Sequence, residues 1–307
     1  MILTVALNAA LDVTYTIDAE LRPYATHRVG SVELRAGGKA LNTARVLHSL
    51  GEPVLATGLL GGVTGDEIAA RIPAGLPHSF TRIAAESRRA VVVADAVGAT
   101  GFWEPGPQAN VKEWHAFLDH YEALLRVAEV VVLSGSIPGI LPGAYTGLVR
   151  AARFRGVDSI LDCDGPPLVH AAECGPTVVK PNAEELADAF DDLDTSTLDG
   201  VVEAANRLRA KGAEAVVASR GADGLIAVTP EGSFTATPPE VVTGNPTGAG
   251  DACNAALARG IRHATGWPQR LREAVALSAA AVKSPVAGQV DTRDYLKFRH
   301  HVHVKEL

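Results

Sequence analysis

The sequence has 307 residues, of which 47% are hydrophobic and 21% are charged, and its formal net charge is -7. This composition is ordinary for a folded soluble protein and excludes a largely disordered chain. The acidic balance disfavours nucleic acid or an anionic membrane surface as the main partner, because such partners bind clustered Lys and Arg.

Short runs rich in Val, Ile and Leu alternate with helical patterns along most of the chain. Continuous apolar strands between amphipathic helices indicate an α/β protein with a mainly parallel sheet covered on both faces. We predict strands at Ile2–Leu7, Val54–Leu60, Glu129–Ser134, Asp158–Asp162, Thr177–Lys180, Ala213–Ser219 and Leu225–Thr229. We predict helices at Leu41–Leu50, Val111–Arg126, Ala144–Arg155, Ala183–Phe190, Val201–Lys211, Gly250–Arg262, Pro268–Lys283 and Thr292–His300.

Three segments interrupt this order by alternating polar and apolar residues: Val13–Ile17, Arg28–Leu34 and Ala90–Trp103. Alternation indicates strands with one solvated face. We therefore expect a small antiparallel sheet, formed by insertions at about 12–36 and 87–108 in a single domain that spans residues 1–307. A sheet with an uncovered apolar face often serves as a lid or a dimer interface, so a homodimer through this sheet is an expectation.

The cysteines and the first residues bear on where the protein works. Cys163, Cys174 and Cys253 form neither a CxxC pair nor a metal-ligand spacing, so we expect reduced thiols packed in the core. No apolar run reaches the roughly 18 residues of a membrane helix. The start of the chain lacks the basic region of a signal peptide and is typical of a first core strand. We expect a cytoplasmic protein without a membrane partner.

The most informative stretch is Gly244–Ala256, with the sequence GNPTGAGDACNAA. Its small residues precede a predicted helix, so backbone N–H groups converge at the positive end of the helix dipole and form an anion hole. Asp251, in the first turn, would lie beside the anion and accept a proton from an attacking alcohol. Phosphoryl transfer needs these two elements side by side. Taken alone, the pattern is equally that of a Gly-rich helix start in which Asp251 complements the dipole.

A second stretch, Arg35–Leu47, has the sequence RAGGKALNTARVL. Its glycines allow close approach of the backbone, Lys39 offers a point charge, and Asn42 offers both a donor and an acceptor. A turn followed by an amphipathic helix explains the glycines equally well.

Five motifs occur in a fixed order: Asn8–Asp12 (NAALD), AGGKALNTARVL, Ser134–Pro138 (SGSIP), Lys180–Glu185 (KPNAEE) and NPTGAGDA. In this combination the sequence resembles the PfkB family of ribokinase-like carbohydrate kinases, in the branch of 1-phosphofructokinase and tagatose-6-phosphate kinase. The resemblance covers Thr4 to about Gly288. It implies a ribokinase-like α/β fold with a small β lid, and ATP and Mg²⁺ as cofactors.

The resemblance assigns roles to residues on the catalytic and nucleotide sides. It implies that Asp251 is the catalytic base and that Gly248, Ala249 and Gly250 form the anion hole. It implies that Glu185 holds Mg²⁺ through water. The residues implied to lie along the nucleotide are Lys180, Asn182, Glu185, Ser219, Gly221 and Gly224.

On the acceptor side, the resemblance matches Asp12, Gly38, Lys39 and Asn42 to the positions that grip sugar hydroxyls. Arg88 would bind the phosphate of the acceptor in a bidentate fork, although a solvated strand edge also explains this residue. Ser136 would touch the sugar, unless its turn is purely structural. The sequence departs from the branch at Ala9, Ala40, Gly101 and Arg220. Two of these departures, Ala40 and Gly101, lie on the acceptor side, so they leave the identity of the sugar open.

We therefore expect an ATP-dependent kinase of a ketohexose phosphate that binds no nucleic acid. One alternative is a kinase of an unphosphorylated sugar or nucleoside on the same fold. Another is a non-catalytic, sugar-binding regulatory protein, which the presence of Asp251 and Glu185 argues against. A nucleotide-dependent dehydrogenase is disfavoured because no GxGxxG follows the first strand.

Overall fold

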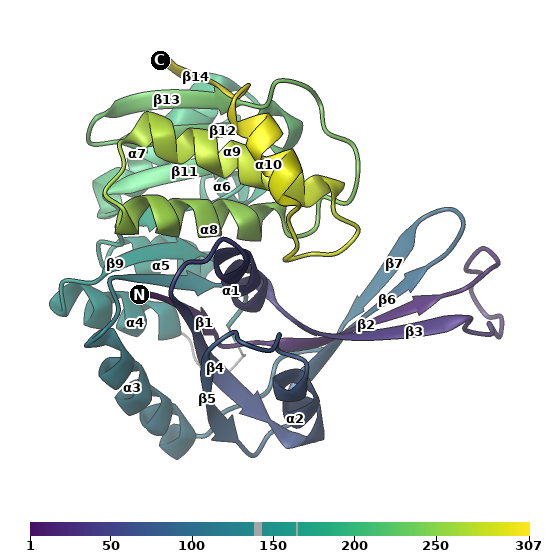
Figure 1. The fold of residues 1–307 in the computed structure, drawn as a ribbon. Coiled ribbons are helices and arrows are strands. Elements are labelled where there is room, and N and C mark those ends of the chain that lie inside the picture. Colours follow the sequence, from purple (N-terminus) through teal and green to yellow (C-terminus); the bar gives the residue numbers. More distant parts are fainter. Residues whose placement is uncertain (138–142, 164) are drawn as a thin grey trace.

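A ten-stranded sheet forms the body of the protein (Figure 1) in a computed structural model that describes residues 1–137, 143–163 and 165–307. Its strands are β1 (Ile2–Ala6), β4 (Val54–Gly61), β5 (His78–Ile83), β8 (Val130–Ser134), β9 (Asp158–Asp162), β10 (Val178–Val179), β11 (Ala215–Ser219), β12 (Leu225–Thr229), β13 (Gly232–Thr237) and β14 (His303–Glu306). They are ordered β14-β13-β12-β11-β10-β9-β8-β1-β4-β5. The strands from β5 to β11 pair in parallel, and β12, β13 and β14 continue the sheet in antiparallel pairs.

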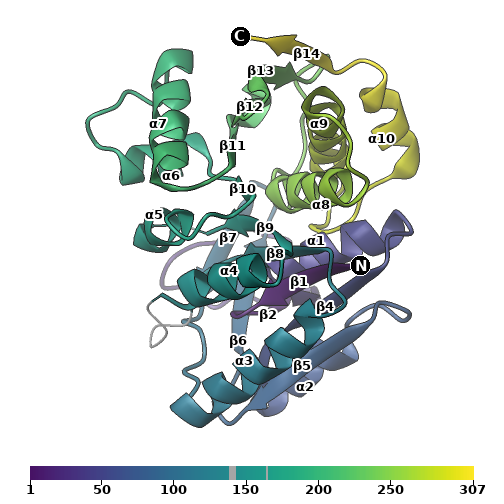
Figure 2. The same ribbon diagram turned by 90° about the vertical axis from the view of Figure 1, so that its left-hand side faces the viewer.

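Helices cover both faces of this sheet and bury two apolar cores. The helices are α1 (Lys39–Ser49), α2 (Gly62–Ala70), α3 (Val111–Leu125), α4 (Ala144–Phe154), α5 (Pro166–Ala172), α6 (Ala183–Ala189), α7 (Leu198–Lys211), α8 (Ala249–Arg262), α9 (Trp267–Lys283) and α10 (Thr292–Arg299). Figure 2 shows α5–α7 on one side of the sheet and α8–α10 on the other. Strand residues alternate between the two cores: Val130 and Val132 belong to one, and Val131 and Leu133 to the other. The predicted mainly parallel sheet with helices on both faces is confirmed.

Within the described part of the chain, none of the helices combines the length and the apolar character that crossing a membrane requires.

Among the elements that the structure describes, the sequence patterns missed three strands and two helices. β5 is an edge strand whose residues are mostly half-buried, and β13 and β14 form the other, antiparallel edge. Edge strands lack the continuous apolar run that marks a strand buried on both faces. The helices α2 and α5 are short, so their apolar periodicity covers few turns. Pro138 of the SGSIP motif lies outside the described residues.

A second, four-stranded sheet projects from the body (Figure 1). Its strands are β2 (Ala10–Thr16), β3 (Ser31–Gly37), β6 (Arg88–Ala94) and β7 (Ala99–Trp103), in the order β3-β2-β6-β7. The pairs β2–β3 and β6–β7 are antiparallel, as expected, whereas the central pair β2–β6 is parallel. The alternation predicted the strands, but the direction of the central pair depends on how two distant hairpins dock. We call this sheet the lid.

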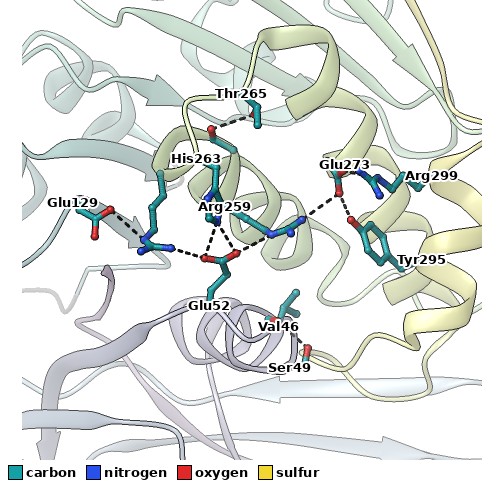
Figure 3. Close-up of polar contacts among 12 residues, drawn as sticks. Val46, Ser49, Glu52, Glu129, Arg259, His263, Thr265, Glu273, Tyr295 and Arg299 are labelled. Atoms are coloured by element: carbon teal, nitrogen blue, oxygen red, sulfur yellow. Dashed lines mark hydrogen bonds and ion pairs between the residues drawn. The ribbon is translucent and has the colours of Figure 1, made fainter.

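An ionic network anchors the C-terminal end of α8 (Figure 3). The buried Glu52 accepts hydrogen bonds from Arg259 Nε at 2.9 Å and Arg262 Nη1 at 3.0 Å, and its Oε1 lies 2.9 Å from His263 Nε2. Arg259 Nη1 lies 3.5 Å from the buried Glu273 of α9. This network fixes α8 against the loop that follows α1 and against α9, at the end of the helix opposite Asp251.

Candidate active site

One cavity of about 1380 Å³ opens at the carboxyl ends of the parallel strands, between the body and the lid. Ser134 ends β8, Asp162 ends β9 and Ser219 ends β11, and all three line the cavity. Open α/β sheets bind their ligands at this edge. All the residues predicted for the site line this cavity: Asp12, Gly38, Lys39, Asn42, Arg88, Ser136, Lys180, Asn182, Glu185, Ser219, Gly221, Gly224, Gly248, Ala249, Gly250 and Asp251.

The start of α8 forms the floor of the cavity. Gly248 caps the helix in the left-handed conformation, with φ 91°, and a Cβ there would lie 3.0 Å from both Cα and Cβ of Ala287. Glycine is therefore required at this position. The Ser278 hydroxyl donates to the carbonyl oxygen of Ala249 at 2.9 Å and ties the first turn to α9. The turn thus presents the backbone and the positive end of the α8 dipole to the cavity.

Asp251 lies in this first turn, and only 5% of it is exposed. Its Oδ2 accepts a hydrogen bond from Asn42 Nδ2 at 2.9 Å. Burial raises the pKa of Asp251 to about 7, and the nearby Asp162 carboxylate adds to this effect, against the Asn42 hydrogen bond and the charges of Lys39 and Lys180. A base whose pKa lies near neutrality suits proton transfer at physiological pH.

Asp162 joins the two lysines of the site. Its Oδ1 lies 3.2 Å from Lys39 Nζ, and its Oδ2 lies 3.1 Å from Lys180 Nζ and 2.6 Å from Asn254 Nδ2. Burial alone would raise the pKa of Asp162, but Lys180 and Lys39 hold it below its ordinary value. The carboxylate therefore stays ionised and fixes both ammonium groups beside Asp251.

Asp12 lines the cavity at the root of the lid, early in β2. Burial raises its pKa to about 6, against the charges of Arg45, Arg88 and Arg35. A Cβ on Gly37 would lie 2.0 Å from Asp12 Oδ2, so only glycine leaves room for this carboxyl.

Asn8 connects Arg88 to Ser136. Its carbonyl oxygen accepts a hydrogen bond from Arg88 Nε at 3.2 Å, and its side-chain amide donates to Ser136 Oγ at 2.9 Å. Arg88 is half-buried and lines the cavity. The exposed Trp103 of the lid lines the cavity as well. These contacts gather polar groups from β6, the turn after β8 and the loop after β1 at one end of the cavity.

The other end of the cavity lies over β11 and the start of α6. Asn182 and Glu185 form a capping box, in which Glu185 N donates to Asn182 Oδ1 at 2.8 Å and Asn182 N donates to Glu185 Oε2 at 2.8 Å. Ser219 is bridged to Asn182, and a 3₁₀ turn, Gly221–Asp223, follows it. Half-buried apolar side chains, including Val242 and Val282, line the wall nearby.

Comparison with known proteins identifies the family. The family described as pfkB family carbohydrate kinase matches residues 6–293 of the chain. The chain belongs to the pfkB family.

Solved structures agree with this membership. The kinase is similar to phosphofructokinase-2 from Escherichia coli in complex with potassium, with a TM-score of 0.90, 27% identity, and coverage of 97% of this chain and 98% of that one. It is also similar to a Thermotoga maritima protein described as a possible 1-phosphofructokinase, with a TM-score of 0.88, 29% identity, and coverage of 100% and 99%. Arabidopsis thaliana ribokinase complexed with ribose and ATP shares the fold, with a TM-score of 0.76, 20% identity, and coverage of 97% and 98%. The pfkB chain is thus an ATP-dependent sugar kinase.

Sequence reasoning missed three polar residues in or next to the kinase site: Asp162, which lines the cavity, and Asn254 and Arg45, which contact residues of its lining. Asp162 is the last residue of a predicted buried strand. A carboxylate at the carboxyl end of such a strand indicates a ligand-binding position, so the sequence did contain a signal for this residue. Asn254 lies one turn after Asp251 on α8, and Arg45 lies one turn after Asn42 on α1. Helical spacing alone places Asn254 on the same helix face as Asp251, and Arg45 on the same face as Asn42. It does not show which groups Asn254 and Arg45 contact.

Proposed function

We propose that this pfkB kinase transfers the γ-phosphoryl group of ATP to a hydroxyl of a ketohexose phosphate, of the fructose 1-phosphate or tagatose 6-phosphate class, with Asp251 as the base. The observation that carries the proposal is the buried Asp251 carboxyl in the first turn of α8, beside Lys39 and Lys180. A proton acceptor, an anion hole and two cations converge there, which are the groups that in-line phosphoryl transfer requires.

The reaction proceeds by one displacement. Asp251 accepts the proton of the attacking hydroxyl as its oxygen forms a bond to the γ-phosphorus. The bond from the γ-phosphorus to the bridging oxygen breaks, and that oxygen leaves with ADP. The backbone of Gly248, Ala249 and Gly250 stabilises the charge on the transferred group. Closure of the lid excludes water, which would otherwise compete as the acceptor.

The donor set suits Mg²⁺ held mainly by phosphate oxygens and water. Among the described residues, no three His, Cys, Asp or Glu side chains cluster as a metal site. Mg²⁺ commonly uses one or two carboxylates together with substrate phosphates. Glu185, positioned at the cavity wall by its bond to Asn182 N, would contact the ion through water. When bound, Mg²⁺ would neutralise negative charge on the triphosphate.

Arg88 supports a phosphorylated acceptor. Its half-buried guanidinium lines the cavity near Asp12 and presents the planar donors that grip phosphate. Phosphofructokinase-2 from Escherichia coli, 26% identical to this chain, has been solved in complex with fructose-6-phosphate. A neutral sugar could not use the charge of Arg88 as a phosphate does.

The test is turnover with ATP against fructose 1-phosphate, tagatose 6-phosphate, fructose 6-phosphate, fructose and ribose. We expect the highest kcat/KM for a phosphorylated ketohexose. Arg88→Ala should raise KM for that substrate about 10- to 100-fold, because a charged hydrogen-bonding partner is lost. The matched control is Arg89→Ala, since Arg89 is the exposed neighbour and contacts Glu104. Equal or better turnover of fructose or ribose would contradict the acceptor class.

The lid supports assembly of two copies of the chain. Asp12 and Trp103, which share one face of the lid, line the cavity. The opposite face carries Val32, Leu34 and Phe102, which are 55%, 38% and 56% exposed. A second copy pairing through this apolar face would cover it, and phosphofructokinase-2 from Escherichia coli has a tetrameric inhibited form. Sedimentation should give a dimer for the native chain and a monomer for Phe102→Ser; a native monomer would contradict the assembly.

A further inference from the structure

A chain of hydrogen bonds leads from Arg45 to the proposed base. Arg45 Nη1 donates to Asn42 Oδ1 at 3.0 Å, and Arg45 Nη2 donates to the carbonyl oxygen of Ala36. Asn42 Nδ2 in turn donates to Asp251 Oδ2 at 2.9 Å. Arg45 and Asn42 lie one turn apart on α1, so the backbone helix holds the pair in register.

The chemistry of the two side chains allows a single orientation of the Asn42 amide. A guanidinium carries donors and no acceptor, so the oxygen of the amide must face Arg45. The amino group of Asn42 then faces Asp251 and donates to its carboxylate. A flipped amide would set its nitrogen against the Arg45 donor and its oxygen against the carboxylate, and both contacts would be repulsive.

Arg45 acts from outside the catalytic cavity. It lines a second cavity of about 520 Å³, together with His48 and Lys283, whereas Asn42 and Asp251 line the catalytic one. Its contact with the Ala36 carbonyl oxygen anchors it to the end of β3. Arg45 is thus placed to set the orientation of a neighbour rather than to touch substrate.

We infer that Arg45 is a positioning residue: it fixes the Asn42 amide with its amino group toward Asp251, which favours the ionised, proton-accepting form of that carboxyl. This inference rests on the proposed function for its catalytic meaning. A donor to a carboxylate favours the charged form, whereas an acceptor favours the protonated form. Without Arg45, the amide can turn its oxygen toward Asp251 and stabilise the proton there.

Other charged groups lie near both ends of this series of hydrogen bonds, and the variants used in a test must leave those groups unchanged. Asp251 is influenced by Asp162, Lys39 and Lys180. Arg45 is influenced by Asp12 and Arg35. A substitution of Arg45 therefore also changes the charge near Asp12. A site-specific readout on Asp251 separates the two carboxyls.

The experiment follows the carboxyl carbon of Asp251 by NMR in protein labelled with ¹³C at aspartate Cγ, with its signal assigned through Asp251→Asn. In Arg45→Met, the pKa of Asp251 should rise by about one unit, which corresponds to the loss of one hydrogen bond to the ionised form. Arg45→Lys keeps the charge and one donor, so its rise should be smaller. The control Arg71→Met, at the C-cap of α2 and paired with Glu67, should leave the Asp251 signal unchanged.

A double substitution distinguishes positioning from a direct effect of charge. In an Asn42→Ala background, adding Arg45→Met should cause no further rise, because the mediator is already absent. An undiminished rise in that background would show that Arg45 acts through space and would overturn the inference. An unchanged Asp251 pKa in Arg45→Met would overturn it as well.

The pH profile of turnover separates this inference from the proposed function. The acid limb of kcat/KM in Arg45→Met should move to higher pH together with the NMR titration. If the NMR titration moves and the acid limb does not, the link through Asn42 stands and the role of Asp251 as the base fails.

Discussion

The substitution Asp251→Asn removes a carboxyl whose burial opposes ionisation, so it should stabilise the fold at neutral and alkaline pH. The pKa of Asp251 is raised from 3.8 to about 7 in the folded protein. Between these values the folded chain binds the proton and the unfolded chain releases it, so stability falls as pH rises from about 4 to 7. About three pH units separate the two values, and each is worth about 1.4 kcal/mol, which gives about 4 kcal/mol as an upper value. Asparagine can still accept the bond from Asn42 Nδ2, so the hydrogen bond is kept.

The assay is urea unfolding of both proteins between pH 5 and pH 9. The free energy of unfolding of Asp251→Asn should exceed that of the native protein by an amount that grows with pH and levels off above pH 7. Asp66→Asn serves as a control, because Asp66 is a surface residue whose side chain is 70% exposed. A stability difference that does not change with pH would show that folding does not raise the pKa of Asp251.

Three further predictions test other parts of the molecule. Glu52→Ala should lower the free energy of unfolding by about 1.5–3 kcal/mol, because the half-buried Arg259 and Arg262 lose a buried charged partner and keep only Glu273 and Glu129; a loss below about 0.5 kcal/mol in urea unfolding would contradict the anchoring of α8. Gly37→Ala should raise KM for the acceptor at least about tenfold, because the added methyl group displaces the Asp12 carboxyl. The control Gly147→Ala should be tolerated, because a Cβ there has no neighbour within 4 Å. Equal KM values in the two variants would count against the Asp12 contact. The acid limb of kcat/KM should fall near pH 7, because protonated Asp251 cannot accept a proton; a rate that stays flat to pH 5 is the opposing result.

The sequence predicted those site residues that belong to contiguous motifs. Lys39 and Asn42 lie on one helix start, and Gly248 and Asp251 on another, so local spacing alone brings each pair together. The family resemblance then placed both starts in one site. Every residue on the resulting list lines the cavity, but Asp162, which also lines it, is missing from that list.

The contacts that organise the site depend on residues far apart in the chain. Asp162 is separated from Lys39 by 123 positions and from Asn254 by 92. No local pattern links these residues, because the parallel sheet brings them together only after crossover connections. The same reason explains the parallel β2–β6 pair of the lid, where alternation indicates a strand but not the direction of its partner.

The edges of the main sheet escaped prediction for a related reason. β13 and β14 carry exposed and half-buried residues, so neither shows a continuous apolar run. Their assignment depends on pairing between segments near residues 235 and 305. Apolar runs in the sequence therefore predict the central strands of this sheet but miss its edge strands.

The most direct test of the account is the turnover number of Asp251→Asn with ATP and the best acceptor from the substrate panel. We expect a loss of about 10²- to 10⁴-fold in kcat, the usual range for removal of a general base, in a protein that remains folded and still binds ATP. Turnover within a few-fold of the native enzyme would contradict the assignment of Asp251 as the base.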